Sequence, residues 1–222
     1  NICNEQSVRI EYCAEMFKSD GSFASMMMKT IKRGSAGEYS RELSTKVFQG
    51  QSRLIQMCYR QGGMAGFGLR RMLVDTHGAH LRVLKLGEKK SLQTERVVLV
   101  KGPEEEVETV QWIYDQFLNQ GRKETQIADD LNKNEIKTDL NRHWNRGTVN
   151  QILTNEKYIG NNVYNRQSFK LKQERVKNPP EDWIRNDDAF PALIDKEVFF
   201  KVQGIILERA RRYSNDEMIS LL

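Results

Sequence analysis

The 222-residue chain is long enough for one large or two small domains with cores of their own. It is 38% hydrophobic and 29% charged with a net charge of +5, and its apolar stretches span only a few residues, which excludes a membrane-spanning helix. Three scattered cysteines argue against a Cys-x-x-Cys zinc site or a disulfide framework, and no basic segment precedes an apolar run at the N-terminus. We therefore expect a cytoplasmic protein with no signal peptide, metal or cofactor.

Charge is segregated along the chain. Residues 29–101 carry 15 basic and 5 acidic side chains (net +10), residues 102–140 carry 4 and 10 (net −6), and residues 141–177 carry 8 and 2 (net +6). Two basic blocks flanking an acidic one are typical of a protein that binds a polyanion, although solvated helix faces can carry the same blocks. We expect the two basic blocks to converge on one continuous face that fits a DNA double helix.

A long helix is predicted from about Phe23 to about Met57, after a short strand at 8–12 and with Asp20 or Ser22 as its N-cap. Its small and apolar positions recur every three or four residues, a spacing that favours packing against another helix. These positions are Ala36, Tyr39, Leu43, Val47, Gly50, Leu54 and Met57. Because such a helix outgrows a small domain, we expect it to project from its parent fold or to pair with a partner chain.

The glycine-rich segment 61–68 predicts a linker or domain boundary. Two strands are expected next, around 81–86 and 94–100, with a turn at 87–90 between them. Pro103 and the glutamates after it predict a helix start, since acidic side chains suit the positive end of the helix dipole. The apolar face of this helix comprises Val107, Val110, Ile113, Tyr114 and Phe117.

Two short amphipathic helices are predicted over about 124–132 and from about Asn145 onward. The first places Ile127, Ala128 and Leu131 on one side, and the second places Val149, Ile152 and Leu153 at i, i+3 and i+4. Such a pair indicates a helix-turn-helix with an expanded connection, or a plain helical hairpin with a polar outer face. In the first case Asn150, Gln151 and Thr154 face outward, where amide side chains can bond adenine edges.

The remaining chain predicts an extended arm or hairpin at 161–171, a break at Pro179-Pro180 and a final packed segment. Apolar anchors are expected at Trp183, Phe190, Leu193, Ile194, Phe199 and Phe200. A closing helix is expected from Val198, Val202, Ile205 and Ile206.

Four segments, in this order, resemble the large serine recombinases. Residues 12–22 are similar to the last strand region of that family's catalytic domain, residues 31–44 to its long exit helix, and residues 62–71 to the junction into the recombinase domain. The signature of that domain is carried by Ile127-Ala128, Leu131-Asn132, Trp144, Val149, Ile152-Leu153, Asn155 and Tyr158-Ile159-Gly160. No single piece is specific, but their order and spacing together make the match.

The resemblance implies a fold and a domain division. The expected fold is α+β and mainly helical: a long dimerisation-type helix, then a mixed DNA-binding domain with an expanded helix-turn-helix and a small β-hairpin. Residues 1–60 would be the C-terminal remnant of the catalytic domain, and residues 61–222 the recombinase domain. In the family the exit helix mediates dimer contacts and its far end approaches the minor groove.

The resemblance also implies a chemistry for the parent enzyme. A serine hydroxyl attacks a DNA phosphodiester, a phosphoserine link forms, and its reversal rejoins the DNA after strand exchange. The family's Tyr-x-Arg-x-Ser-like motif does not occur in this sequence. We therefore expect this chain to bind attachment-site DNA without cleaving it.

Candidate site residues follow from the same comparison. Where relatives carry a catalytic Glu-Arg pair on the long helix, this chain has Thr45-Lys46, so Lys46, or Arg41 in another register, is a possible phosphate contact, and a surface role for Lys46 is equally open. The expected DNA-binding residues are Arg70, Arg71, Arg142, Asn145, Arg146, Thr148, Asn150, Gln151, Thr154, Lys157, Arg166, Lys170 and Lys172.

The expected partners are double-stranded DNA and, in a full-length protein, further copies of the chain as a homodimer or tetramer. One alternative is a stand-alone DNA-binding transcriptional regulator without recombinase chemistry. Another is an RNA-binding or phosphate-ligand protein that uses the glycine-rich stretch at 62–68, but no Gly-Lys-Ser/Thr loop follows that stretch.

Overall fold

The computed structural model describes residues 6, 8, 22–169 and 174–210, and the chain divides into two compact units, Asn1–Gln51 and Ser52–Leu222. Of the strand predicted at 8–12, residues 9–12 lie outside the described residues. Mixed helices and small antiparallel sheets make up the fold, as the sequence predicted in outline. Among the described residues, no helix is both long and apolar enough to cross a bilayer.

Helix α2 spans Phe23–Gln56, close to the range that the sequence predicted. Ser22 caps its start, because the Ser25 amide donates to the Ser22 hydroxyl at 3.3 Å. In unit 1 the seam positions Tyr39, Leu43 and Val47 are exposed. Their expected role in pairing with a second copy stays a prediction.

The first sheet of unit 2 has the order β2-β1-β3 and comprises β1 (Leu69–Val74), β2 (His80–Leu84) and β3 (Arg96–Lys101). Both strands predicted from the sequence exist, but each pairs antiparallel with β1 rather than with the other. Strand β1 was missed because Arg70-Arg71 interrupt its apolar alternation. The glycine-rich segment before it is no free linker in the structure: Phe67 and Gly68 are buried within unit 2.

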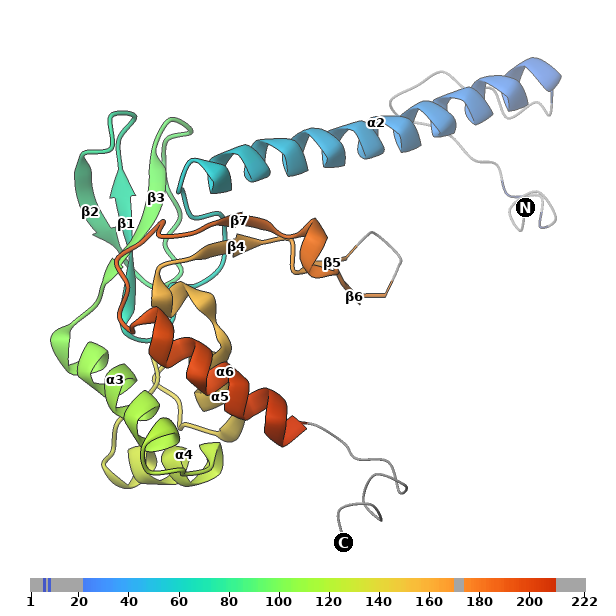
Figure 1. Cartoon of the computed structure of the whole chain (residues 1–222). Helices are drawn as coiled ribbons and strands as arrows, with labels where there is room; N and C mark the ends of the chain where they lie inside the picture. Colours follow the sequence, from blue (N-terminus) through green and yellow to red (C-terminus); the bar gives the residue numbers. More distant parts are fainter. Residues whose placement is uncertain (1–5, 7, 9–21, 170–173, 211–222) are drawn as a thin grey trace, which may run out of the picture. The chain divides into compact units, whose positions relative to one another are not determined.

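Four helices pack together beside this sheet in unit 2 (Figure 1). They are α3 (Glu104–Leu118), α4 (Glu124–Lys133), α5 (Arg146–Thr154) and α6 (Lys196–Ala210). All eleven apolar positions predicted for the faces of α3, α4 and α5 are buried in one core. Burial of each large aliphatic or aromatic side chain stabilises the fold by about 1.5–3 kcal/mol. Because these side chains recur at the helical period, the sequence pattern was enough to locate the three helices.

Short elements complete unit 2. They are the 3-10 helices η1 (Glu156–Ile159) and η2 (Pro180–Asp182), and the strands β4 (Asn162–Tyr164), β5 (Gln167–Ser168), β6 (Val176–Lys177) and β7 (Ile184–Asn186). Strand β4 pairs with β7 and β5 with β6, so the segment predicted as an extended arm or hairpin contributes to two small sheets. Phe200, predicted as an anchor, is instead 57% exposed, because α6 turns its neighbour Phe199 into the core.

Candidate nucleic-acid interface

Helix α5 presents one buried face and one polar face. Val149, Ile152 and Leu153 lie in the core, whereas Arg146 and Gln151 are exposed. Asn150 and Thr154 are half-buried, and the Thr154 hydroxyl donates to the Asn150 carbonyl at 2.7 Å. The outward side of α5 therefore carries one cation and amide donors and acceptors, as the sequence predicted from the 3.6-residue period.

The start of α5 is fixed by a reciprocal cap. The Thr148 amide donates to Asn145 Oδ1 at 3.0 Å, and the Asn145 amide donates to the Thr148 hydroxyl at 2.9 Å. Asn145 and Thr148, both predicted to contact DNA, thus make local hydrogen bonds that set the helix origin. They position Arg146, the first residue of the helix, at its exposed N-terminal end.

The long connection between α4 and α5 is clamped to the core. Asn132 at the end of α4 donates from Nδ2 to the Trp144 carbonyl at 2.9 Å and accepts the Trp144 amide at 2.8 Å. The Trp144 ring is buried edge-on against Phe67, with centroids 4.9 Å apart. This double hydrogen bond holds α5 in a fixed position relative to α4 despite the long connection.

Arg70 and Arg71 have internal partners in the structure. Arg70 forms a two-bond ion pair with Glu106, at 2.6 Å from Nη2 to Oε1 and 2.9 Å from Nη1 to Oε2, and the hydrogen bonds that it donates to this carboxylate raise the Arg70 pKa. Burial pushes the Glu106 pKa up, but the Arg70 and Gly68 N–H bonds outweigh it and hold the pKa below its usual value. Arg71 donates to the carbonyls of Lys85 and Glu88. Both arginines brace the sheet, and their expected contact with DNA stays a prediction.

Lys157 is also turned inward. Its Nζ donates to the Ala65 carbonyl at 2.7 Å and lies 5.2 Å from the centre of the Tyr158 ring. Burial lowers the Lys157 pKa to about 8, with a smaller contribution from the nearby charge of Arg60. Lys157 is therefore held in place by the fold, and its expected contact with DNA stays a prediction.

The other expected contacts differ in how far the structure describes them. Arg142 is exposed beside α5 and its main-chain N–H donates to the Thr138 hydroxyl. Arg166 stacks 5.0 Å from the Trp183 ring, where the indole N–H donates to the Asn178 carbonyl. Lys170 and Lys172 lie outside the described residues.

The two candidate phosphate contacts of unit 1 lie exposed on α2. Arg41 pairs with Glu38 at 2.9 Å, and Lys46 pairs with Glu42 at 3.5 Å.

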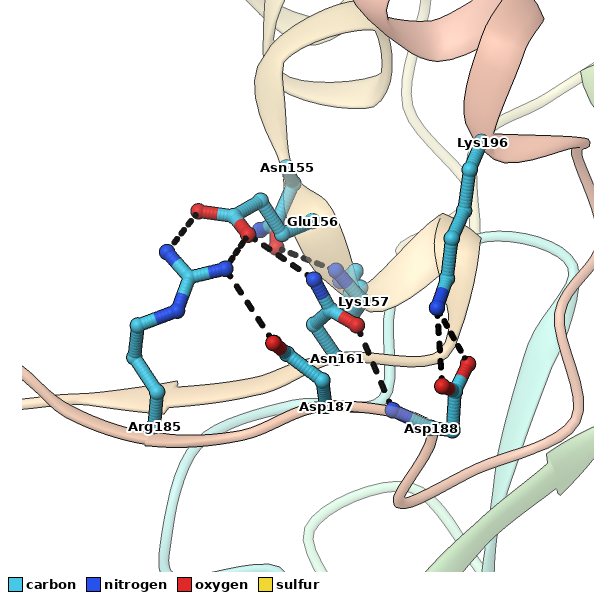
Figure 2. Close-up of polar contacts among 8 residues, drawn as sticks. All are labelled: Asn155, Glu156, Lys157, Asn161, Arg185, Asp187, Asp188 and Lys196. Carbon is cyan, nitrogen blue, oxygen red and sulfur yellow. Dashed lines mark hydrogen bonds and ion pairs between the residues drawn. The ribbon is translucent and has the colours of Figure 1, made fainter.

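A polar network that the sequence did not reveal connects η1, which follows α5, to β7 and α6 (Figure 2). Arg185 on β7 reaches both carboxylate oxygens of Glu156, at 3.2 and 2.6 Å, and also Asp187 at 3.1 Å. Asn161 donates to Glu156 at 3.0 Å and accepts the Asp188 amide, and Lys196 at the start of α6 pairs with Asp188. The cations of Arg185 and Lys196 are therefore neutralised within the fold and tie η1 to β7 and α6.

No group of three or more His, Cys, Asp or Glu side chains able to hold a metal ion occurs among the described residues. The candidate site is the α5 face with its flanking Arg142, where exposed side chains offer hydrogen bonds and positive charge.

Residues 104–209 match the family model named Recombinase, from the first residue of α3 into the last turn of α6. This part of the chain carries a Recombinase domain. The matched segment contains the α4–α5 pair and the network of Figure 2. The family resemblance inferred from the motifs between 124 and 160 is confirmed.

Solved structures of related proteins extend the comparison. An LSR–DNA complex aligns over 76% of this chain and 41% of its own, at 18% sequence identity and a TM-score of 0.43. A structure from work on the sequence requirements of the Listeria innocua prophage attP site aligns over 53% of this chain and 40% of its own, at 21% identity and a TM-score of 0.35. The chain thus spans about two fifths of the length of these proteins.

Proposed function

We propose that unit 2 is the DNA-binding part of a serine site-specific recombinase and that it holds attachment-site duplex DNA. The supporting observation is α5, a short capped helix whose outward face offers Arg146, Asn150 and Gln151 while its apolar face is locked into the core. The α4–α5 pair then acts as an expanded helix-turn-helix, with α5 as the recognition helix in the major groove.

Several arginines of unit 2 are neutralised within the fold, whereas those beside α5 are not. Arg70, Arg82, Arg122 and Arg185 each form an ion pair with a carboxylate of the fold. Within the part of the chain that the structure describes, Arg142 and Arg146 form none. Unneutralised cations at the N-terminal end of a recognition helix are suited to phosphate or guanine contacts.

The finer assignments belong to the same proposal. Residues 1–60 would be the end of the catalytic domain, with α2 pairing two copies through Tyr39, Leu43 and Val47, and residues 61–222 the recombinase domain. We assign no nucleophilic serine within this chain, and propose that it binds DNA without cutting it. Lys46 and Arg41 would approach the backbone near the minor groove from the exit helix.

Binding to duplex DNA should fall steeply with salt. With about four phosphate contacts, a rise from 50 to 200 mM monovalent salt should weaken binding ~150-fold, because each neutralised phosphate releases a condensed counterion. Mobility-shift titrations of the chain with duplex selected from a randomised pool would measure this. Affinity that is unchanged by salt, or tighter binding to RNA than to duplex DNA, would contradict the proposal.

Sequence preference should depend on Arg146 and Gln151. Arg146→Ala and Gln151→Ala should each cost about 1–3 kcal/mol of discrimination at one base position, while affinity for unrelated duplex changes much less. Gln120→Ala and Lys201→Ala, exposed on unit 2 outside α5 itself, serve as matched controls. Equal losses for all four variants would rule out α5 as the recognition helix.

A further inference from the structure

A hollow lies between the glycine-rich loop and the start of α5. Its lining includes Gly66 of the loop, Asp139 and Arg142 of the connection, Thr148 of α5, and Lys157. Lys157 and Tyr158 belong to η1, which follows α5 directly. Three separate segments of unit 2 thus contribute polar groups to one concave surface.

The sequence of the loop is adapted to the Lys157 ammonium. A Cβ added at Gly66 would lie 2.1 Å from Lys157 Nζ, and Gly66 has φ +93°. Glycine adopts this backbone conformation readily, and with any larger residue at 66 the end of the Lys157 side chain would have to move. The Ala65 carbonyl, one residue earlier, accepts its hydrogen bond at 2.7 Å. Lys157 is therefore held in a specific position at the wall of the hollow.

Two cations at or near the hollow, Lys157 and Arg60, are not neutralised by a carboxylate. Neither Lys157 nor Arg60 forms an ion pair among the described residues, and Arg60 Nε is buried without a hydrogen-bond partner. The two cations are close enough for Arg60 to lower the Lys157 pKa, while Asp139 opposes that effect. Confined cations without a carboxylate at contact distance are costly, and an anion that enters the hollow relieves the cost.

We propose that this hollow, which Arg60 does not line, binds a phosphate group between Lys157 and Arg142. Its ligand is either a phosphodiester of the bound duplex or free inorganic phosphate, because both present the same phosphate oxygens. The first of these two sources rests on the function proposed above. Thr148 and the N-terminal end of the nine-residue α5 lie beside the same hollow and favour negative charge. Asp139 limits the affinity, because its carboxylate repels the ligand.

Inorganic phosphate, titrated into the full chain at constant ionic strength with chloride as the balancing anion, tests the site alone. At ten times its Kd, phosphate should raise the Tm by about 3–6 °C over chloride. Lys157→Met should abolish this response, Arg142→Gln should reduce it, and Asp139→Asn should enlarge it. Lys201→Met, which removes an exposed lysine of α6, should leave it unchanged. Equal responses to phosphate and chloride, or a weaker response in Asp139→Asn, would overturn the proposal.

Duplex DNA, titrated in parallel, separates the two sources of phosphate. If the backbone occupies the hollow, Lys157→Met should reduce the slope of log affinity against log salt by about one. If that slope is unchanged while the response to inorganic phosphate is lost, the site stands with a free anion as its ligand. If the wild-type chain binds no duplex but still responds to phosphate, the proposed function fails and the site remains.

Discussion

Gly160→Ala should be among the most destabilising single substitutions in unit 2, by about 3 kcal/mol. Gly160 ends η1 with φ +88°, a left-handed conformation that costs alanine energy whatever the space around it. An added Cβ would also lie 2.5 Å from the Phe190 carbonyl oxygen, and the Phe190 amide donates to the Gly160 carbonyl at 3.0 Å. Backbone faces backbone here, so no side-chain rotation can relieve the contact. Thermal unfolding should show a Tm about 6–12 °C lower.

Gly204→Ala is the matched control, because it makes the same chemical change in the opposite setting. Gly204 lies inside α6, and a Cβ added there meets nothing within 4 Å. Alanine at this position should stabilise the protein by about 0.5–1 kcal/mol through its higher helix propensity. A similar loss of stability in both variants would mean that the close approach of η1 to Phe190 does not constrain the fold.

The helices were predictable from sequence because burial repeats at the helical period. Val107, Val110 and Ile113 on α3, like Val149 and Ile152 on α5, are buried where the 3.6-residue spacing placed them. Strand β1 was not predictable in the same way, since its central position in the sheet comes from pairing with two partners distant in sequence. A strand with arginines in its middle is stabilised by neighbours that no local pattern reveals.

The candidate site was only half predictable for a related reason. Residue type suggested which side chains could bind DNA, but the availability of each charge depends on partners far along the chain. Arg70 pairs with Glu106, 36 residues away in the sequence, and Arg185 pairs with Glu156, 29 residues away. Both positive charges are therefore neutralised within the fold. The exposed positions of Arg146 and Gln151, by contrast, could be predicted from the local sequence of α5. Among the signature residues, Asn132 and Trp144 serve the fold by clamping the α4–α5 connection.

Lys157 should make the stability of the protein rise with pH between 8 and about 10.4, the ordinary pKa of a lysine. The folded-state pKa is lowered to about 8 by burial and by the charge of Arg60, with Asp139 opposing, so in this window the unfolded chain binds more protons than the folded one. The penalty for burying the charged ammonium is full below pH 8 and is relieved as Lys157 deprotonates in the folded state.

The comparison with Lys157→Met isolates this effect, because the raised pKa values of the buried Tyr114 and Tyr158 are shared by both proteins. Met fills the same volume beside Gly66 without a charge. From pH 7 to pH 10, wild type should gain about 2.5 kcal/mol of unfolding free energy relative to Lys157→Met. Denaturant unfolding at several pH values in chloride buffer measures the difference. Parallel curves would mean that Lys157 titrates like a solvated lysine, which would remove the confined charge on which the phosphate site depends.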